Sequence, residues 1–66
     1  MSSKDIVAML RAKHNKMVLT KKETAKELGI STAGLDRLRD NNAIDAKMIG
    51  GKVTYRIDEV ARFLSL

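Results

Sequence analysis

The sequence predicts one mainly α-helical domain with a small β-hairpin, and three observations lead to this fold class. Residues 20–42 contain two short helical segments separated by Gly29. The pair Gly50-Gly51 lies between two segments of alternating pattern, which is a signal for a two-residue hairpin turn. Amphipathic segments at 3–15 and 58–64 predict one helix before and one helix after these elements. This order of elements is typical of a winged helix-turn-helix.

Composition limits the classes of protein to which the chain can belong. Its 66 residues make one domain, 1–66, with a small core, and it has no cysteine and one histidine. Disulfides and the usual structural zinc sites are therefore excluded. Tyr55 and Phe63 are the only aromatic residues, which argues against single-stranded nucleic-acid binding by base stacking. No apolar run could span a membrane and no signal peptide is visible, so we expect a cytoplasmic protein without a membrane partner.

The positive charge is concentrated in the N-terminal third. The formal net charge is +5, and residues 1–22 carry six Lys or Arg residues against Asp5 alone, whereas residues 23–66 carry seven of each sign. A net positive charge indicates a polyanionic partner, most often nucleic acid and sometimes a membrane surface. The sequence contains no carboxylate pair, no nucleophile with a base and no phosphate-cradling loop. We therefore expect no enzyme activity, no catalytic residue, no metal and no cofactor.

The basic N-terminal segment, residues 1–16, predicts an amphipathic helix over residues 3–15. Ser2 or Ser3 can cap this helix. Its apolar face consists of Ile6, Val7, Met9 and Leu10. Packing of this face on the core, a dimer contact and a phosphate-binding arm are three open roles for the helix. We expect His14 to be a surface residue near the helix end, with no partner spaced to make it a ligand.

Residues 20–42 have the capping signals of a helix-turn-helix. Thr20 and Glu23 can form a capping box at the start of the first helix. Gly29 can adopt the left-handed conformation that ends this helix. Ile30 is expected to be buried in the corner, and Ser31 to cap the second helix.

The second helix has the pattern of a DNA-reading helix. Leu35 and Leu38 form its inner face, and the small residue Ala25 lets it cross close to the first helix. Its charged residues are Asp36, Arg37, Arg39 and Asp40, of which we expect the aspartates to orient the arginines. Arg to guanine is the commonest specific pairing in the major groove, so the pattern favours DNA binding over a plain helical hairpin.

After Asn42 the pattern changes from helical to alternating. A two-residue turn pairs Ile49 with Lys52 and Met48 with Val53. The face expected to lie on the core consists of Ala46, Met48, Val53 and Tyr55. The outer face consists of Lys47, Ile49, Lys52, Thr54 and Arg56, three of which are basic. A basic ribbon beside such a helix is typical of a wing that contacts a minor groove or the backbone, and the alternative is an ordinary solvated hairpin face.

Two further elements complete the expected fold. Val18 and Leu19 can add a short strand to the hairpin. Asp58 can cap the closing helix. The inner face of that helix consists of Val60, Phe63 and Leu64, with Phe63 as the largest core side chain.

Residues 19–64 resemble the excisionase type of MerR-like winged-helix domain. The shared features are a Leu-Thr start, a helix ending Leu-Gly-Ile-Ser, a Leu-rich second helix, a hairpin turning on Gly-Gly-Lys and a final helix ending Phe-Leu. The resemblance implies a phage or mobile-element protein that binds adjacent DNA sites cooperatively, bends DNA and directs an integrase toward excision. The departures from the family pattern are Gly34, Asp36, Asp45 and Met48.

The predicted contacts with double-stranded DNA come from three segments. The second helix supplies Ser31, Thr32, Ala33 and Arg37, the wing supplies Lys47, Lys52, Thr54 and Arg56, and Lys21 and Lys22 contact the backbone. The expected partners are double-stranded DNA, an integrase and further copies of the chain on adjacent sites. A transcriptional regulator and the DNA-binding part of a terminase small subunit are alternatives with the same ligand. A protein–protein interaction module or inhibitor is an alternative of another class.

Overall fold

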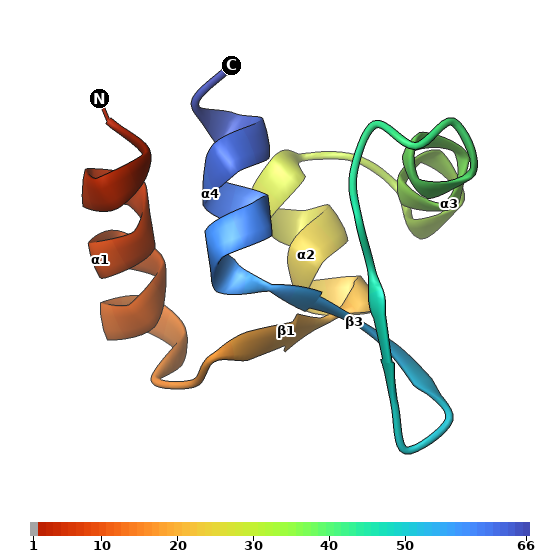
Figure 1. The fold of residues 1–66 in the computed structure, drawn as a ribbon, viewed down its shortest axis with the longest axis horizontal. Coiled ribbons are helices and arrows are strands. Elements are labelled where there is room, and N and C mark those ends of the chain that lie inside the picture. Colours follow the sequence, from red (N-terminus) through yellow and green to blue (C-terminus); the bar gives the residue numbers. More distant parts are fainter. Residues whose placement is uncertain (1) are drawn as a thin grey trace.

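A computed structural model of the protein describes residues 2–66. This part of the chain is a small α/β domain with four helices and a three-stranded antiparallel sheet. The elements follow in the order α1 (Ser3–His14), β1 (Val18–Thr20), α2 (Lys21–Leu28), α3 (Thr32–Asp40), β2 (Lys47–Ile49), β3 (Lys52–Arg56) and α4 (Ile57–Leu64) (Figure 1). None of these helices is both long and apolar enough to cross a lipid bilayer.

The sheet is built around β3, which lies between β1 and β2. The predicted hairpin register is confirmed, because Met48 pairs with Val53 and Ile49 pairs with Lys52. Gly50 and Gly51 make the turn in the left-handed region, with φ angles of 58° and 77°. The short strand expected at Val18 and Leu19 also forms, as β1, and it pairs with β3.

The predicted helix signals are confirmed at three of the four helix starts. The Ser2 side chain accepts from the Asp5 N–H, Thr20 and Glu23 form the capping box, and Ser31 accepts from the Gly34 N–H.

The predicted cap at Asp58 is wrong. Helix α4 begins at Ile57 directly after β3, so that Asp58 lies inside its first turn and Arg56 occupies the cap position without a side-chain hydrogen bond. The N–H of Ile57 donates to the Met17 carbonyl at 3.1 Å, so a backbone contact takes the place of a side-chain cap.

The core lies between the sheet and the helices. Its buried apolar residues are Leu10, Leu19, Ala25, Leu35, Ile44, Tyr55, Ile57, Val60 and Ala61. The largest fully buried side chain is Tyr55, whereas Phe63 is only partly buried, so the expectation that Phe63 is the largest core residue is wrong. Burial raises the pKa of the Tyr55 hydroxyl.

Three apolar residues that the pattern assigns to the interior, Ile30, Met48 and Leu64, are exposed, and so is Met9 on the apolar face of the first helix. Met9 is 57% exposed because it lies about 100° around α1 from Leu10, which packs toward α4. Ile30 lies on the surface against Gly34 at the start of α3. Leu64 is exposed at the last turn of the short helix α4, and Met48 is exposed near the hairpin tip.

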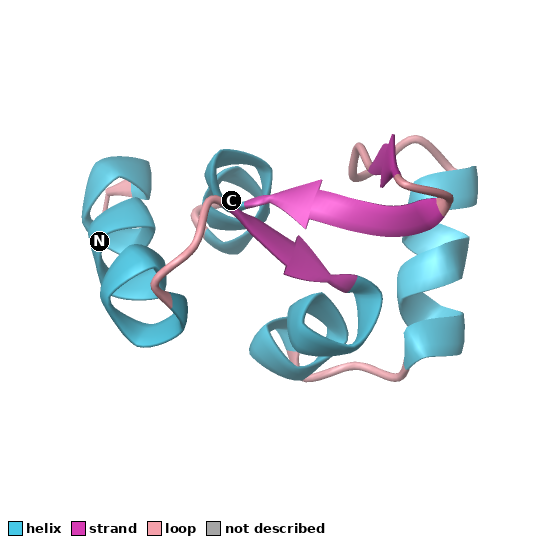
Figure 2. Cartoon of the chain, turned by 90° about the horizontal axis from the view of Figure 1, so that it is seen from below, coloured by secondary structure: helices cyan, strands magenta, loops and turns pink. Residues whose placement is uncertain are grey.

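The two ends of the molecule carry different elements. Helix α1 packs along α4 at one end. Helix α3 and the β2–β3 hairpin lie at the other end, and they do so both in Figure 1 and in the perpendicular view of Figure 2. Helix α2 lies between these ends and contacts β1, β3 and α3 (Figure 1).

Candidate nucleic-acid interface

The turn between α2 and α3 fixes how α3 is presented. Gly29 adopts φ 71°, and the Ile30 N–H donates to the Ala25 carbonyl at 3.0 Å, which closes the end of α2. Ser31 then starts α3 at once. Because Leu35 is fully buried and α3 packs on α2, one side of α3 is fixed against the domain. The opposite side of α3 is left facing outward.

The outward side of α3 presents small polar and cationic groups. Thr32, Ala33 and Arg37 are exposed, and Ala33 and Arg37 lie one turn apart on the same face. Arg37 forms no ion pair with any residue from 2 to 66. The Ser31 hydroxyl accepts from the Gly34 N–H at 3.0 Å and remains able to donate.

Asp36 is paired differently from the prediction. Its Oδ1 lies 2.9 Å from Lys21 Nζ and 4.0 Å from Arg39 Nη2. The expected orientation of an arginine by an aspartate is therefore present only for Arg39. The nearest cation to the Asp36 carboxylate is Lys21, the first residue of α2.

Lys21 and Lys22, the two predicted backbone contacts, have different environments. Lys22 is exposed and has no carboxylate within ion-pair distance among the described residues. Lys21 is half-buried and held by Asp36. Lys22 is therefore available to a phosphate without rearrangement, whereas Lys21 must first separate from Asp36.

The hairpin is the most cationic element of the fold. Lys47, Lys52 and Arg56 are exposed, and the sequence has no acidic residue between Asp45 and Asp58. None of these three cations forms an ion pair within residues 2–66. The Thr54 hydroxyl donates to the Lys47 carbonyl at 2.8 Å, so in this conformation it does not donate a hydrogen bond to a ligand. The three cations are the hairpin groups that can bind an anion.

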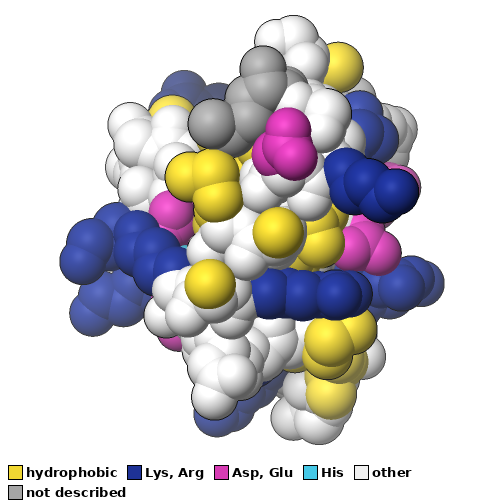
Figure 3. Space-filling model, turned by 90° about the vertical axis from the view of Figure 1, so that its left-hand side faces the viewer, with side chains coloured by type: hydrophobic (Ala, Val, Ile, Leu, Met, Phe, Trp, Pro, Cys, Tyr) yellow, Lys and Arg dark blue, Asp and Glu magenta, His cyan; other side chains and the backbone are white. Residues whose placement is uncertain are grey.

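The tertiary structure separates the predicted contacts from the N-terminal charge. Helix α3 and the tip of the β2–β3 hairpin lie at the same end of the molecule, whereas α1 lies at the other (Figures 1 and 2). Arg56 is the exception among the predicted hairpin contacts, because it lies at the start of α4. Figure 3 shows the outer face of α1, where Lys and Arg side chains surround exposed apolar groups. Met9 and Met17, 57% and 63% exposed, are the large apolar residues of this region.

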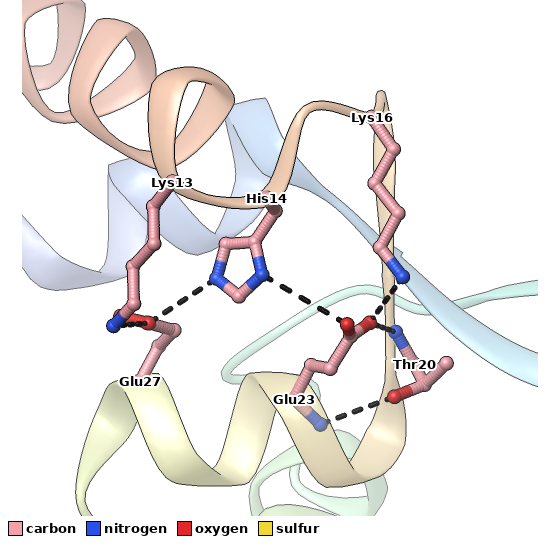
Figure 4. A network of polar contacts seen from close by, with 6 residues as sticks. All are labelled: Lys13, His14, Lys16, Thr20, Glu23 and Glu27. Atoms are coloured by element: carbon pink, nitrogen blue, oxygen red, sulfur yellow. Dashed lines mark hydrogen bonds and ion pairs between the residues drawn. The ribbon is translucent and has the colours of Figure 1, made fainter.

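Sequence reasoning missed the role of His14. Its side chain is only 13% exposed and lies between two carboxylates of α2 (Figure 4). The Nε2 atom is 3.2 Å from Glu27 Oε2, and Nδ1 is 3.8 Å from Glu23 Oε2. The expectation of a surface histidine without partners is therefore wrong. The signal was available in the helical periodicity, because position 14 falls on the same face as Leu10.

Two lysines complete this network. Lys13 Nζ lies 2.7 Å from Glu27 Oε2, and Lys16 Nζ lies 2.6 Å from Glu23 Oε1. The Lys16 ammonium and the Thr20 N–H hold the pKa of Glu23 at about 2. Hydrogen bonds from Lys13, and to a smaller extent from His14, lower the pKa of Glu27. The network joins α1 and the following loop to α2. We call these residues the α1–α2 clamp: Lys13, His14, Lys16, Glu23 and Glu27.

These ion pairs change where free positive charge is found. Lys13, Lys16 and Lys21 belong to the basic N-terminal third, and each is paired with a carboxylate from the neutral remainder. The cations without an ion-pair partner among the described residues are Lys4, Arg11, Lys22, Lys26, Arg37, Lys47, Lys52 and Arg56. Uncompensated charge is therefore present on α2, α3 and the hairpin as well as on α1.

Other parts of the surface offer little for a small ligand. An open cleft of about 600 Å³ lies between the base of the hairpin and α4. Glu59 in this cleft is paired with Arg62 at 2.8 Å and accepts from the Asp45 N–H at 2.8 Å. The Glu59–Arg62 pair thus occupies one wall of the cleft, and the cations Lys47 and Arg56, which form no ion pair within residues 2–66, also line it. Within residues 2–66, no three His, Cys, Asp or Glu side chains come together as a metal site would require.

No protein-family model matches the chain, and comparisons with curated proteins and with solved structures find no significant match.

Proposed function

We propose that the protein is a winged helix-turn-helix that binds double-stranded DNA. In this proposal α3 enters the major groove, with Thr32 and Ala33 close to the bases and Arg37 on a base edge. The hairpin is the wing, and Lys47, Lys52 and Arg56 bind phosphates beside the neighbouring minor groove. Lys22 binds the backbone at the start of α2.

The single observation that supports this function best is the common location of two surfaces. The outward side of α3 and the acid-free hairpin lie at one end of the molecule (Figures 1 and 2). An exposed helix beside a cationic β-ribbon matches a duplex, whose groove accepts a helix and whose backbone attracts cations. The motif resemblance of residues 19–64 agrees with this function.

The biological role proposed first is that of an excisionase. Few base contacts are available in one small domain, so high specificity needs several copies on adjacent sites. Cooperative binding, bending of the DNA and promotion of excision by an integrase follow from the resemblance. A small transcriptional regulator would use the same surface and is the alternative.

Titration of a fluorescent duplex at several salt concentrations tests DNA binding. Five cations without an ion-pair partner are proposed to contact the duplex, and they predict that log K falls with log [salt] with a slope of about −4.5. They are Lys22, Arg37, Lys47, Lys52 and Arg56. A single-stranded oligonucleotide of the same length is the control and should bind more weakly. Absence of duplex binding at low salt would contradict the proposal and would favour a protein–protein module.

A DNA footprint on the genomic region that surrounds the coding sequence separates the two biological roles. Several adjacent protected sites with a bend support the excisionase role. Protection of one promoter-proximal site without a bend supports a transcriptional regulator.

A further inference from the structure

The tip of the β2–β3 hairpin exposes two large apolar side chains. Met48 is 66% exposed and Ile49 is 53% exposed. The hairpin projects beyond α2 and α4, so no helix covers its tip (Figure 1). Isolated exposed apolar residues are common, but these two are adjacent and lie at a projecting cationic turn.

The two side chains lie on opposite faces of the ribbon, because successive residues of a strand alternate. Ile49 is directly opposite Lys52 in the register, and Lys47 is on the same face two pairs further from the tip. Met48 is opposite Val53, on the face that leads back to the buried Tyr55. Ile49 is thus the apolar residue that lies among free cations.

The turn makes Ile49 the apolar side chain that lies nearest to the tip. Gly50 and Gly51 carry no side chain, and an added Cβ at either position would meet nothing within 4 Å. The tip is consequently narrow, and only the Ile49 and Lys52 side chains stand beside it. A narrow ribbon with one branched apolar side chain and flanking ammonium groups fits a groove that has phosphates on both walls and base edges at its floor.

We propose that Ile49 is a wedge that enters the minor groove and inserts partly between two stacked base pairs. Lys47 and Lys52 bind the phosphates on either side, and the insertion kinks the duplex at each bound site. The inference rests on the proposed DNA-binding function and assigns the origin of the bend to one side chain. Because pyrimidine–purine steps unstack most readily, the wedge favours TA or CA/TG steps under the wing.

The test uses the full-length protein and a duplex that carries one footprinted site, with a fluorescent dye at each end to report the bend. A 2-aminopurine base at the step under the wing reports unstacking by increased fluorescence. The variant Ile49→Ser removes the wedge. The matched control is Met48→Ser, which removes a neighbouring exposed apolar side chain from the opposite face of the same strand.

We expect the wild-type protein and Met48→Ser to bend the duplex and to raise the 2-aminopurine signal. Ile49→Ser should lose both signals while its affinity falls by no more than about tenfold. Both variants should give the wild-type circular dichroism spectrum, because both side chains are exposed.

Four results would overturn the wedge. One is an unchanged bend in Ile49→Ser, and another is an equal loss of bend in Met48→Ser. The third is binding to anionic phosphatidylserine vesicles but not to the duplex, which would also overturn the proposed function. Duplex binding by the wild-type protein without any change at the probe base refutes the wedge alone.

Discussion

The ammonium group of Lys21 lies 2.9 Å from Oδ1 of Asp36, and this ion pair joins the first residue of α2 to the middle of α3. Both side chains are about one-third exposed, so the pair adds at most about 1 kcal/mol to stability. Its larger consequence is for binding. A phosphate that approaches Lys21 must compete with Asp36, and Asp36 itself repels the phosphate.

Replacing Asp36 by Asn should therefore increase DNA affinity. The change frees Lys21 and removes a negative charge beside the proposed groove surface, so the salt dependence should become steeper by about one unit of slope. The free energy of unfolding should fall by less than about 1 kcal/mol. Fluorescence titration at several salt concentrations measures the first effect, and urea unfolding measures the second.

The matched control is Asp5→Asn, which makes the same change of charge on α1 at the other end of the molecule. It should leave DNA affinity nearly unchanged. Equal gains in Asp5→Asn and Asp36→Asn would mean that only the net charge matters, and that Lys21 has no special place at the interface.

Removal of the Arg37 side chain tests base recognition by α3. Arg37→Ala should weaken binding to the preferred site by about 1–3 kcal/mol and should relax the preference at one base position. A panel of duplexes that differ at single positions, titrated with both proteins, gives this result. Arg11→Ala removes an arginine from α1 that is also exposed and unpaired within residues 2–66, and it should have little effect. Identical site preferences in wild type and Arg37→Ala would refute a groove contact.

The α1–α2 clamp should contribute to stability and not to DNA binding. Glu27→Gln weakens the contacts of one carboxylate with Lys13 and His14, and we expect a loss of about 1 kcal/mol, or about 4–8 °C in Tm. Asp45→Asn, at an exposed carboxylate without an ion pair, is the control. Thermal unfolding followed by circular dichroism measures both variants, and an unchanged Tm in Glu27→Gln would contradict the role of the clamp.

Acid should destabilise the fold through the same carboxylates. Lys16 holds the pKa of Glu23 at about 2 against an ordinary value of 4.5, and Lys13 and Arg62 lower the pKa of Glu27 and Glu59. A carboxyl with a lowered pKa binds protons more weakly in the folded state. Its stabilising effect is complete above about pH 4.5 and is lost as the pH falls toward 2.

The variant Glu23→Gln removes the most strongly shifted of these carboxyls. Its free energy of unfolding should vary less steeply between about pH 4.5 and 2 than that of the wild type. Urea unfolding across this range makes the comparison. The role of Glu23 would be refuted by acid profiles that run parallel in the two proteins.

The sequence by itself determined the local structure. The capping box at Thr20, the left-handed end at Gly29 and the Gly50-Gly51 hairpin all depend on residues within a few positions of one another. Such signals act through backbone conformation and short-range hydrogen bonds, and they remain readable without tertiary context. The exposure of Thr32 and Arg37 also follows from the helical period.

Only the tertiary structure decided which charges remain free and which apolar residues are covered. Lys21 meets Asp36, and His14 meets Glu27, because separate helices bring them together, and no spacing along one helix encodes these contacts. Met48 has the alternation of a core residue but projects past the last covering helix, so it stays exposed. Burial depends on what lies opposite a side chain, and that is a property of the assembled domain.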